Sequence, residues 1–134
     1  MEISKDLAAA SSTPLILSIL QEGDNYGYSI IKKVKELSKG EMEWTAGMLY
    51  PVLHRLENLA LIRSYWDKGE QSRRRKYYSL NERGAAELEK IKTQWRMVDS
   101  TLKKSWGNMK RHLADIFTVF FLSESYPEAD FISR

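Results

Sequence analysis

The 134-residue sequence contains no cysteine, and proline and glycine are scarce at three and seven residues. Without thiols the chain can form no disulfide, no thiolate metal site and no cysteine nucleophile. The longest apolar run near the end, IFTVFFL at 116–122, is far shorter than the roughly 20 residues that cross a bilayer. The first residues also lack the basic-then-apolar pattern of a secretory signal. We therefore expect a cytoplasmic protein that does not enter a membrane.

Side chains suited to catalysis are equally sparse. The two histidines, His54 and His112, fall on different predicted helices and have no paired carboxylate pattern. No glycine-rich phosphate loop is present. The sequence thus predicts no enzymatic activity, no cofactor and no metal.

The net charge is only +3, but the charge is unevenly distributed. Residues 26–80 hold eleven Lys or Arg against six Asp or Glu, whereas the remaining segments hold ten against twelve. A basic middle with mildly acidic flanks is typical of a phosphate-binding module attached to a dimerisation segment. An ordinary solvated surface produces the same asymmetry, so charge alone does not decide the function.

Apolar residues at helical spacing predict three helices in the first sixty residues. The first is expected to start at Pro14 after Thr13, and an earlier helix from about Ser4 to Ala10 would be kinked there. The second runs from Tyr28 to about Leu37, and the third begins after Thr45 as its N-cap. The expected apolar stripe of the third helix is Leu49, Val52, Leu53, Leu56 and Leu59.

Two extended segments follow, at 61–66 and 76–80, and they flank a polar turn with a basic end. Asn81 is then expected to cap a long helix. Three helices, a hairpin and a further helix follow the order of a winged helix-turn-helix. The predicted fold is mainly α with a small β-hairpin. It comprises a DNA-binding domain at 1–80, a dimerisation helix at 81–106 and an amphipathic C-terminal extension at 107–134.

The third helix and the hairpin carry the chemistry expected of a DNA reader. Thr45, Ala46 and Gly47 are small enough for a helix end to approach DNA closely. The four consecutive basic residues 73–76 alternate between strand faces, so about half of them can meet one phosphate backbone. The alternative for a single arginine such as Arg55 is a solvated surface charge. The alternative for the hairpin is an edge strand kept soluble by its charge.

Three segments together resemble the PadR family of bacterial transcriptional regulators: GDNYGYSIIKKVKE, GMLYPVLHRLENLALI and SRRRKYYSLNERG. The resemblance extends from about Thr13 to Trp106 and implies a regulator that binds double-stranded DNA. Met48 stands where many members of the family have threonine. The DNA-contacting residues that the resemblance implies are Tyr28, Lys32, Thr45, Tyr50, Pro51, Arg55, Arg73, Arg74, Arg75 and Lys76.

The long helix shows a heptad pattern, with apolar residues in steps of three and four. This seam extends too far to be covered by a three-helix core, so a two-fold homodimer is expected to bury it. Such a dimer presents two recognition helices about 34 Å apart and implies an inverted-repeat operator. The apolar face of the extension is expected to pack on the partner or on the first helix. The seam residues are Leu88, Ile91, Trp95, Val98 and Leu102.

Trp95 has two interpretations. Its spacing favours the core of the dimer. The segment TQWRMVD, however, resembles the multidrug-binding, LmrR-like subgroup of the PadR family, in which two symmetry-related tryptophans stack on a flat ligand. That resemblance implies a planar hydrophobic or cationic compound between two Trp95 side chains, with Asp99 compensating its charge and Pro14 and Leu17 lining the walls.

The leading hypothesis is therefore a repressor that an aromatic or planar compound releases from its operator. The alternative is a winged-helix module for protein–protein contact that has no specific operator.

Overall fold

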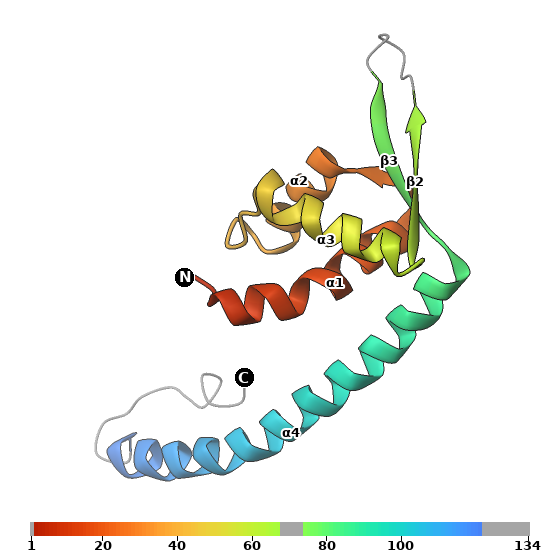
Figure 1. Ribbon diagram of the computed structural model, residues 1–134. Helices are drawn as coiled ribbons and strands as arrows, with labels where there is room; N and C mark the ends of the chain where they lie inside the picture. Colours follow the sequence, from red (N-terminus) through yellow and green to blue (C-terminus); the bar gives the residue numbers. More distant parts are fainter. Residues whose placement is uncertain (1, 68–73, 122–134) are drawn as a thin grey trace. The chain divides into compact units, whose positions relative to one another are not determined.

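The computed structural model describes residues 2–67 and 74–121, with side chains as far as Gly107. It is a mainly helical chain with one small antiparallel sheet and a long C-terminal helix, which confirms the predicted fold class (Figure 1). The chain divides into two compact units, residues 1–92 and residues 93–134. In order, the elements are α1 (Lys5–Glu22), β1 (Asn25–Tyr26), α2 (Gly27–Leu37), α3 (Ala46–Asn58), β2 (Ile62–Asp67), β3 (Arg75–Leu80) and α4 (Glu82–Phe121).

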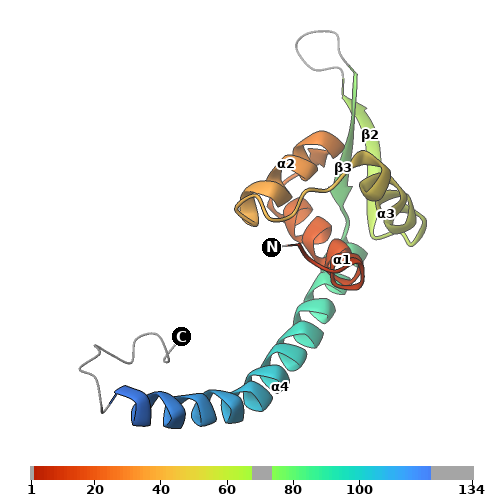
Figure 2. The same cartoon turned by 90° about the vertical axis from the view of Figure 1, so that its left-hand side faces the viewer.

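The sheet has the strand order β1-β3-β2, and both pairings are antiparallel. In the hairpin, which we call the wing, Ile62 lies opposite Leu80 and Asp67 lies opposite Arg75. β1 adds a short third strand that the sequence did not predict. Figures 1 and 2 show β2 and β3 extending beyond the three helices of the first unit. This is the arrangement of a winged helix.

The core of the first unit lies among α1, α2, α3 and the base of the wing. Leu59 does not belong to it and is 51% exposed, contrary to the predicted apolar stripe. The reason is that α3 ends at Asn58 and Leu59 is its C-cap, so the helical periodicity no longer directs this side chain inward. The fully buried side chains include Ile16, Leu17, Ile30, Val34, Leu49, Leu53, Leu56, Ile62 and Leu88.

The helices expected on either side of Pro14 form one continuous helix, α1. It starts at Lys5, where the Ser4 hydroxyl accepts a hydrogen bond from the Leu7 amide at 3.2 Å, and it runs through Pro14. A proline removes one N–H donor from a helix but does not have to end it. The segment before Pro14 has its own cap at Ser4 and an acidic first-turn residue, Asp6, and so it forms helix in its own right.

The start of α4 confirms Asn81 as its cap. The Asn81 side-chain oxygen accepts from the Gly84 amide at 2.9 Å, and its amide nitrogen donates to the Ala60 carbonyl at 2.8 Å. The same residue therefore satisfies the helix end and ties it to the turn after α3.

The first two residues of the predicted dimer seam belong instead to the first unit. Leu88 has no exposed surface and Ile91 packs against the same core. A side chain without exposed surface cannot contribute to an interface, so the assignment of Leu88 to the seam is wrong. The other three seam residues lie in the second unit, and all three are exposed: Trp95, Val98 and Leu102.

Helix α4 continues without a break across the predicted boundary between residues 106 and 107 and is described as far as Phe121. The apolar face predicted for the extension lies outside the residues whose side chains the structure describes. Within the described ranges, no helix is both long and apolar enough to span a membrane.

Gly84 lets α4 start in close contact with the wing. A Cβ atom at this position would overlap the Leu61 carbonyl oxygen and lie 2.6 Å from Leu80 Cδ1. We expect Gly84→Ala to lower the free energy of unfolding by about 2 kcal/mol, because backbone must shift to admit the methyl group. Gly107 lies inside the same helix, where no atom of the described part of the chain lies within 4 Å of such a Cβ, and it is the matched control.

Gly107→Ala should leave the protein as stable as before or stabilise it by up to about 1 kcal/mol, since alanine is the better helix former. Denaturant unfolding of both variants at one protein concentration measures the difference. Equal effects of the two substitutions would show that α4 is not packed tightly at Gly84.

Candidate nucleic-acid interface

Tyr50 lies across the beginning of α2. A Cβ atom on Gly27 would overlap the Tyr50 hydroxyl and lie 2.7 Å from the ring carbon that bears it. Glycine at the first position of α2 therefore makes room for the tyrosine from α3. Despite this contact, Tyr50 remains 45% exposed. The glycine and the aromatic side chain fix the distance between α2 and α3 at the exposed side of the helix pair.

The first turn of α3 is built as predicted. The Thr45 hydroxyl accepts from the Met48 amide at 3.2 Å, which confirms Thr45 as the N-cap. Ala46 and Gly47 are exposed beside it. A helix end with small, exposed residues can approach a large partner closely.

The wing carries its cations on aromatic rings. The Arg74 guanidinium lies 5.3 Å from the centre of the Trp66 ring, and the Lys76 ammonium lies 5.9 Å from that of Tyr78. Arg75 lies over Tyr26 of β1, at 4.5 Å. Such contacts attract the cation to the face of the ring and restrict its motion. The wing therefore presents charges in defined positions.

Strand alternation places these cations on two faces of the wing. Trp66 lies opposite Lys76 and shares its face with Ser64, whose hydroxyl donates to the Glu57 carboxylate of α3 at 2.5 Å. That face is therefore the one that α3 packs against. Arg75 lies opposite Asp67 on the other face. Arg73, which was also predicted to contact DNA, lies outside the described residues.

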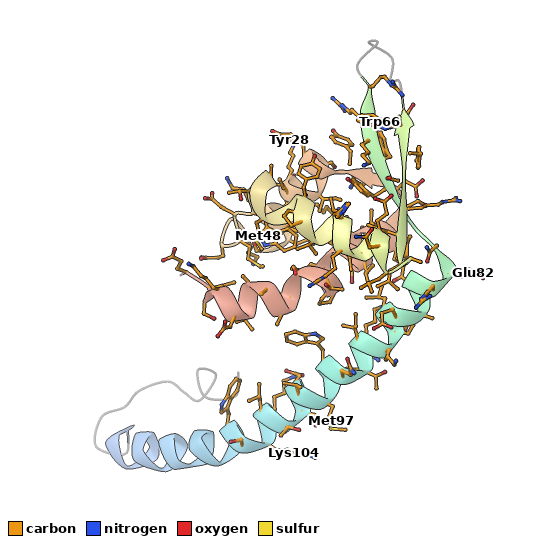
Figure 3. The ribbon with its side chains drawn as sticks, in the orientation of Figure 1. Tyr28, Met48, Trp66, Glu82, Met97 and Lys104 are labelled. Atoms are coloured by element: carbon orange, nitrogen blue, oxygen red, sulfur yellow. The ribbon has the colours of Figure 1, made fainter. Side chains whose placement is uncertain are left out.

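A groove of about 560 Å³ separates the helices from the wing. In Figure 3, Tyr28 lies on the side of α2 and Trp66 on the side of the wing. The groove brings together five of the predicted DNA-contacting residues, and none of the described residues that line it is acidic. Its lining consists of Tyr26, Gly27, Tyr28, Tyr50, Trp66, Arg74, Arg75 and Lys76.

This fold and this surface agree with the comparisons with known proteins. The model of the transcriptional regulator PadR-like family matches residues 16–90, which is more than half of the chain. The chain belongs to the PadR-like family. As a member of it, the protein is a DNA-binding transcriptional regulator, and its family consists of regulators rather than enzymes.

Solved structures of similar proteins include a transcriptional regulator from Clostridium thermocellum. It is 30% identical, with a TM-score of 0.69 over 75% of this chain and 97% of that one. A PadR family regulator from Clostridium difficile is 37% identical, with a TM-score of 0.63 over 70% of this chain and 96% of that one. The transcriptional regulator YqjI of Escherichia coli is 33% identical over 66% of this chain, but the match covers only 41% of YqjI.

Four predicted DNA contacts of this PadR-like regulator lie outside the groove. Lys32 and Pro51 are exposed on α2 and α3. Thr45 is engaged as a cap. The Arg55 guanidinium donates to the Thr13 hydroxyl of α1 at 2.8 Å, so this arginine joins α3 to α1.

Three groove residues were not predicted from the sequence, namely Tyr26, Gly27 and Trp66. The aromatic row that holds the wing against the residues before α2 was not predicted either. The Tyr65 hydroxyl donates to the Asp24 carboxylate at 2.7 Å. Tyr65 stacks on Tyr77 with ring centres 5.8 Å apart, and Tyr77 meets Tyr26 edge-on at 5.3 Å. The local sequence signal for this row is the alternation of side chains along the two wing strands, which places Tyr65 of SYW and Tyr77 of KYY on one face.

The predicted ligand-slot residues differ in their surroundings. Trp95 is 39% exposed, and Asp99 forms an ion pair with Lys103 at 3.0 Å. Pro14 is half-buried within α1. Leu17 has no exposed surface because it points into the core of the first unit, so its assignment to a slot wall is wrong.

The bond between Tyr65 and Asp24 should be visible in a titration. It raises the pKa of Tyr65 to about 12, chiefly because the phenol donates to a carboxylate, and the nearby charges of Asp24 and Asp67 add to the shift. In the unaltered protein, we expect the ring carbon shifts of Tyr65, followed by NMR as the pH is raised, to give this pKa. Asp24→Asn should return it toward the ordinary value of 10.0.

Asp67→Asn is the matched control, since Asp67 acts on Tyr65 through charge and not through this hydrogen bond. It should lower the pKa of Tyr65 much less than Asp24→Asn. Equal shifts from the two variants would contradict the hydrogen bond as the main cause.

Proposed function

We propose that this PadR-like regulator is a homodimeric repressor whose α2, α3 and wing bind an inverted-repeat DNA operator. A planar small molecule bound between the subunits then releases it. The groove between the helices and the wing is the main support. Three cations, two of them arginines, border it together with two exposed tyrosines, and none of the described residues that line it is acidic. A surface of this composition suits a polyanion.

The wing cations are suited to phosphate because they are already oriented. An arginine or lysine normally loses side-chain freedom when it binds a phosphate, and this loss lowers the affinity. Arg75 and Lys76 each lie over a tyrosine ring before DNA arrives, so part of that ordering is complete in the free protein. Tyr28 and Lys32 on α2 then add contacts beside the recognition helix.

Phosphate binding by the wing predicts a specific salt dependence. Affinity for a duplex selected from a random-sequence pool should fall steeply between about 50 and 200 mM salt. Arg75→Ala and Lys76→Ala should each weaken binding to every duplex alike. Each should also reduce the slope of log affinity against log salt by about one, because one counterion fewer is released. Equilibrium binding by fluorescence anisotropy measures both quantities.

Arg63→Ala is the control. Arg63 is an exposed basic residue of the wing, and its side chain does not line the groove. The substitution should leave the slope unchanged. If neither Arg75→Ala nor Lys76→Ala changed the slope of log affinity against log salt, the wing would not be part of the DNA interface. Absence of binding to any duplex would favour a module for protein–protein contact.

The proposed dimer rests on the exposed part of the predicted seam. Trp95, Val98 and Leu102 follow one another in steps of three and four along α4, and all three are exposed in the chain by itself. Covering a stripe of this kind removes apolar surface from water, and a second copy of the same helix offers the matching stripe. Two recognition helices then face one side of the duplex, about one turn apart.

The proposed ligand lies between the Trp95 side chains of the two subunits. Two indole faces make a slot for a planar compound, and their electron-rich faces favour a cation. Asp99 lies one turn along the same helix. Its pair with Lys103 is an exposed i,i+4 pair, a kind that contributes only about 0.5 kcal/mol, so Asp99 can turn to a bound cation at little cost.

Sedimentation should give twice the chain mass of 15.6 kDa. Ethidium, a planar cation, should quench tryptophan fluorescence of this dimer in the absence of DNA. Trp95→Ala should abolish most of that quenching because the slot loses both of its walls. The matched control is Trp106→Ala, which removes another exposed tryptophan of the same helix. Quenching that persists in Trp95→Ala and disappears in Trp106→Ala would show that ethidium binds at Trp106 and not between the Trp95 side chains.

A further inference from the structure

Among the described residues of the wing, Trp66 is the most exposed large aromatic side chain. Its indole is 57% exposed and stands at the groove with the Arg74 guanidinium over it. Large aromatic side chains supply much of the free energy of an interface once they are covered. An exposed indole beside a cationic groove is therefore well suited to contact a binding partner.

The surroundings of Trp66 restrict the chemistry of that partner. Lys76 lies directly opposite on β3, and Arg74 and Arg75 border the same groove. Three cations repel a basic protein surface and favour a polyanion. Of the faces that duplex DNA offers to a narrow hairpin, the minor groove is the one that takes arginine together with apolar side chains.

We propose that Trp66 and Arg74 act as one element that reads the width of the DNA minor groove beside each half-site. The inference rests on the proposed function, because it requires the wing to lie against DNA. It makes Trp66 a specificity-determining residue and gives Arg74 a role different from that of Arg75 and Lys76. The partner chemistry is a narrow, A·T-rich minor groove.

The contact between the Arg74 guanidinium and the Trp66 ring explains why these two residues act together. The potential of a narrow minor groove is strongly negative and attracts the arginine charge, whatever the base sequence contacted elsewhere. The Trp66 ring restricts the motion of the Arg74 guanidinium before binding, and a planar group enters a narrow slot more readily than a hydrated ammonium. Lysine in place of Arg74 would keep the positive charge, but its hydrated ammonium would enter the narrow minor groove less readily.

Strand faces separate this pair from the phosphate-binding cation Arg75. Trp66 lies on the face that α3 packs against, and Arg74 lies over it. Arg75 lies over Tyr26, on the face that carries Tyr65 and Tyr77. The two arginines are neighbours in sequence but meet different rings, so one substitution can test each without disturbing the other.

The experiment uses duplexes that the unaltered full-length chain selects from a random-sequence pool. The base pairs that flank each half-site are then changed to A·T, to G·C or to inosine·C. Inosine·C keeps the major-groove pattern of G·C but lacks the guanine amino group in the minor groove. The unaltered protein should prefer A·T flanks over G·C flanks, and inosine·C should restore most of the affinity.

Trp66→Ala and Arg74→Lys should each reduce the preference for A·T flanks by about threefold or more, whereas Trp66→Phe should retain most of it. The salt slope of Trp66→Ala should stay unchanged because no charge is lost. Arg75→Ala is the control that lowers affinity on all three flanks equally. The far-ultraviolet circular dichroism and melting temperature of each variant establish that it is folded.

Two results would overturn the inference while the proposed function stands. The unaltered protein could bind its selected duplex with no flank preference, or Trp66→Ala could keep the full preference. Failure of the unaltered protein to bind any duplex would instead reject the proposed function, and the inference with it. Flank preference that inosine·C does not restore would place the reading in the major groove and also overturn the inference.

Discussion

The position of the wing depends on the pairing of β1 with β3. Strand β1 contains only Asn25 and Tyr26, which lie opposite Tyr78 and Tyr77 of β3. A two-stranded hairpin alone is marginally stable in water. The third strand joins it to the segment that enters α2, and the row Tyr26, Tyr77 and Tyr65 extends that junction. The distance from the wing cations to the tyrosines of α2 and α3 is thereby fixed.

Features set by neighbouring residues were predictable from the sequence. The caps at Thr45 and Asn81, the course of α2 and the two wing strands follow from periodicity and capping within a few positions. Strand β1 was not predictable, since two residues show no period. The continuity of α1 through Pro14 was not predicted, because Pro14 gives a strong local signal for a helix start, although the cap that the chain uses is Ser4, where an earlier helix was expected.

The candidate site divides in the same way. Its cations and tyrosines are evident in the sequence, but their partners are not, because those lie far away along the chain. Arg55 bonds Thr13 and Tyr65 bonds Asp24, at separations of 42 and 41 residues. Leu88 shows the same limit, since steps of three and four along a helix arise equally from a core and from a dimer seam. Only the packed fold separates Leu88 from Val98.

Helix α4 belongs to both units, and this has a consequence for regulation. Within the first unit it cannot slide or turn freely: Gly84 leaves no space against Leu61, Leu88 is enclosed by the core, and Asn81 is bonded to the turn after α3. In the dimer that we propose, a ligand that repositioned the exposed stripe of α4 would therefore either bend the helix or move the first unit as a body. Because β3 leads directly into that clamped start, such a movement would carry the wing with it and change the spacing of the two proposed half-site readers.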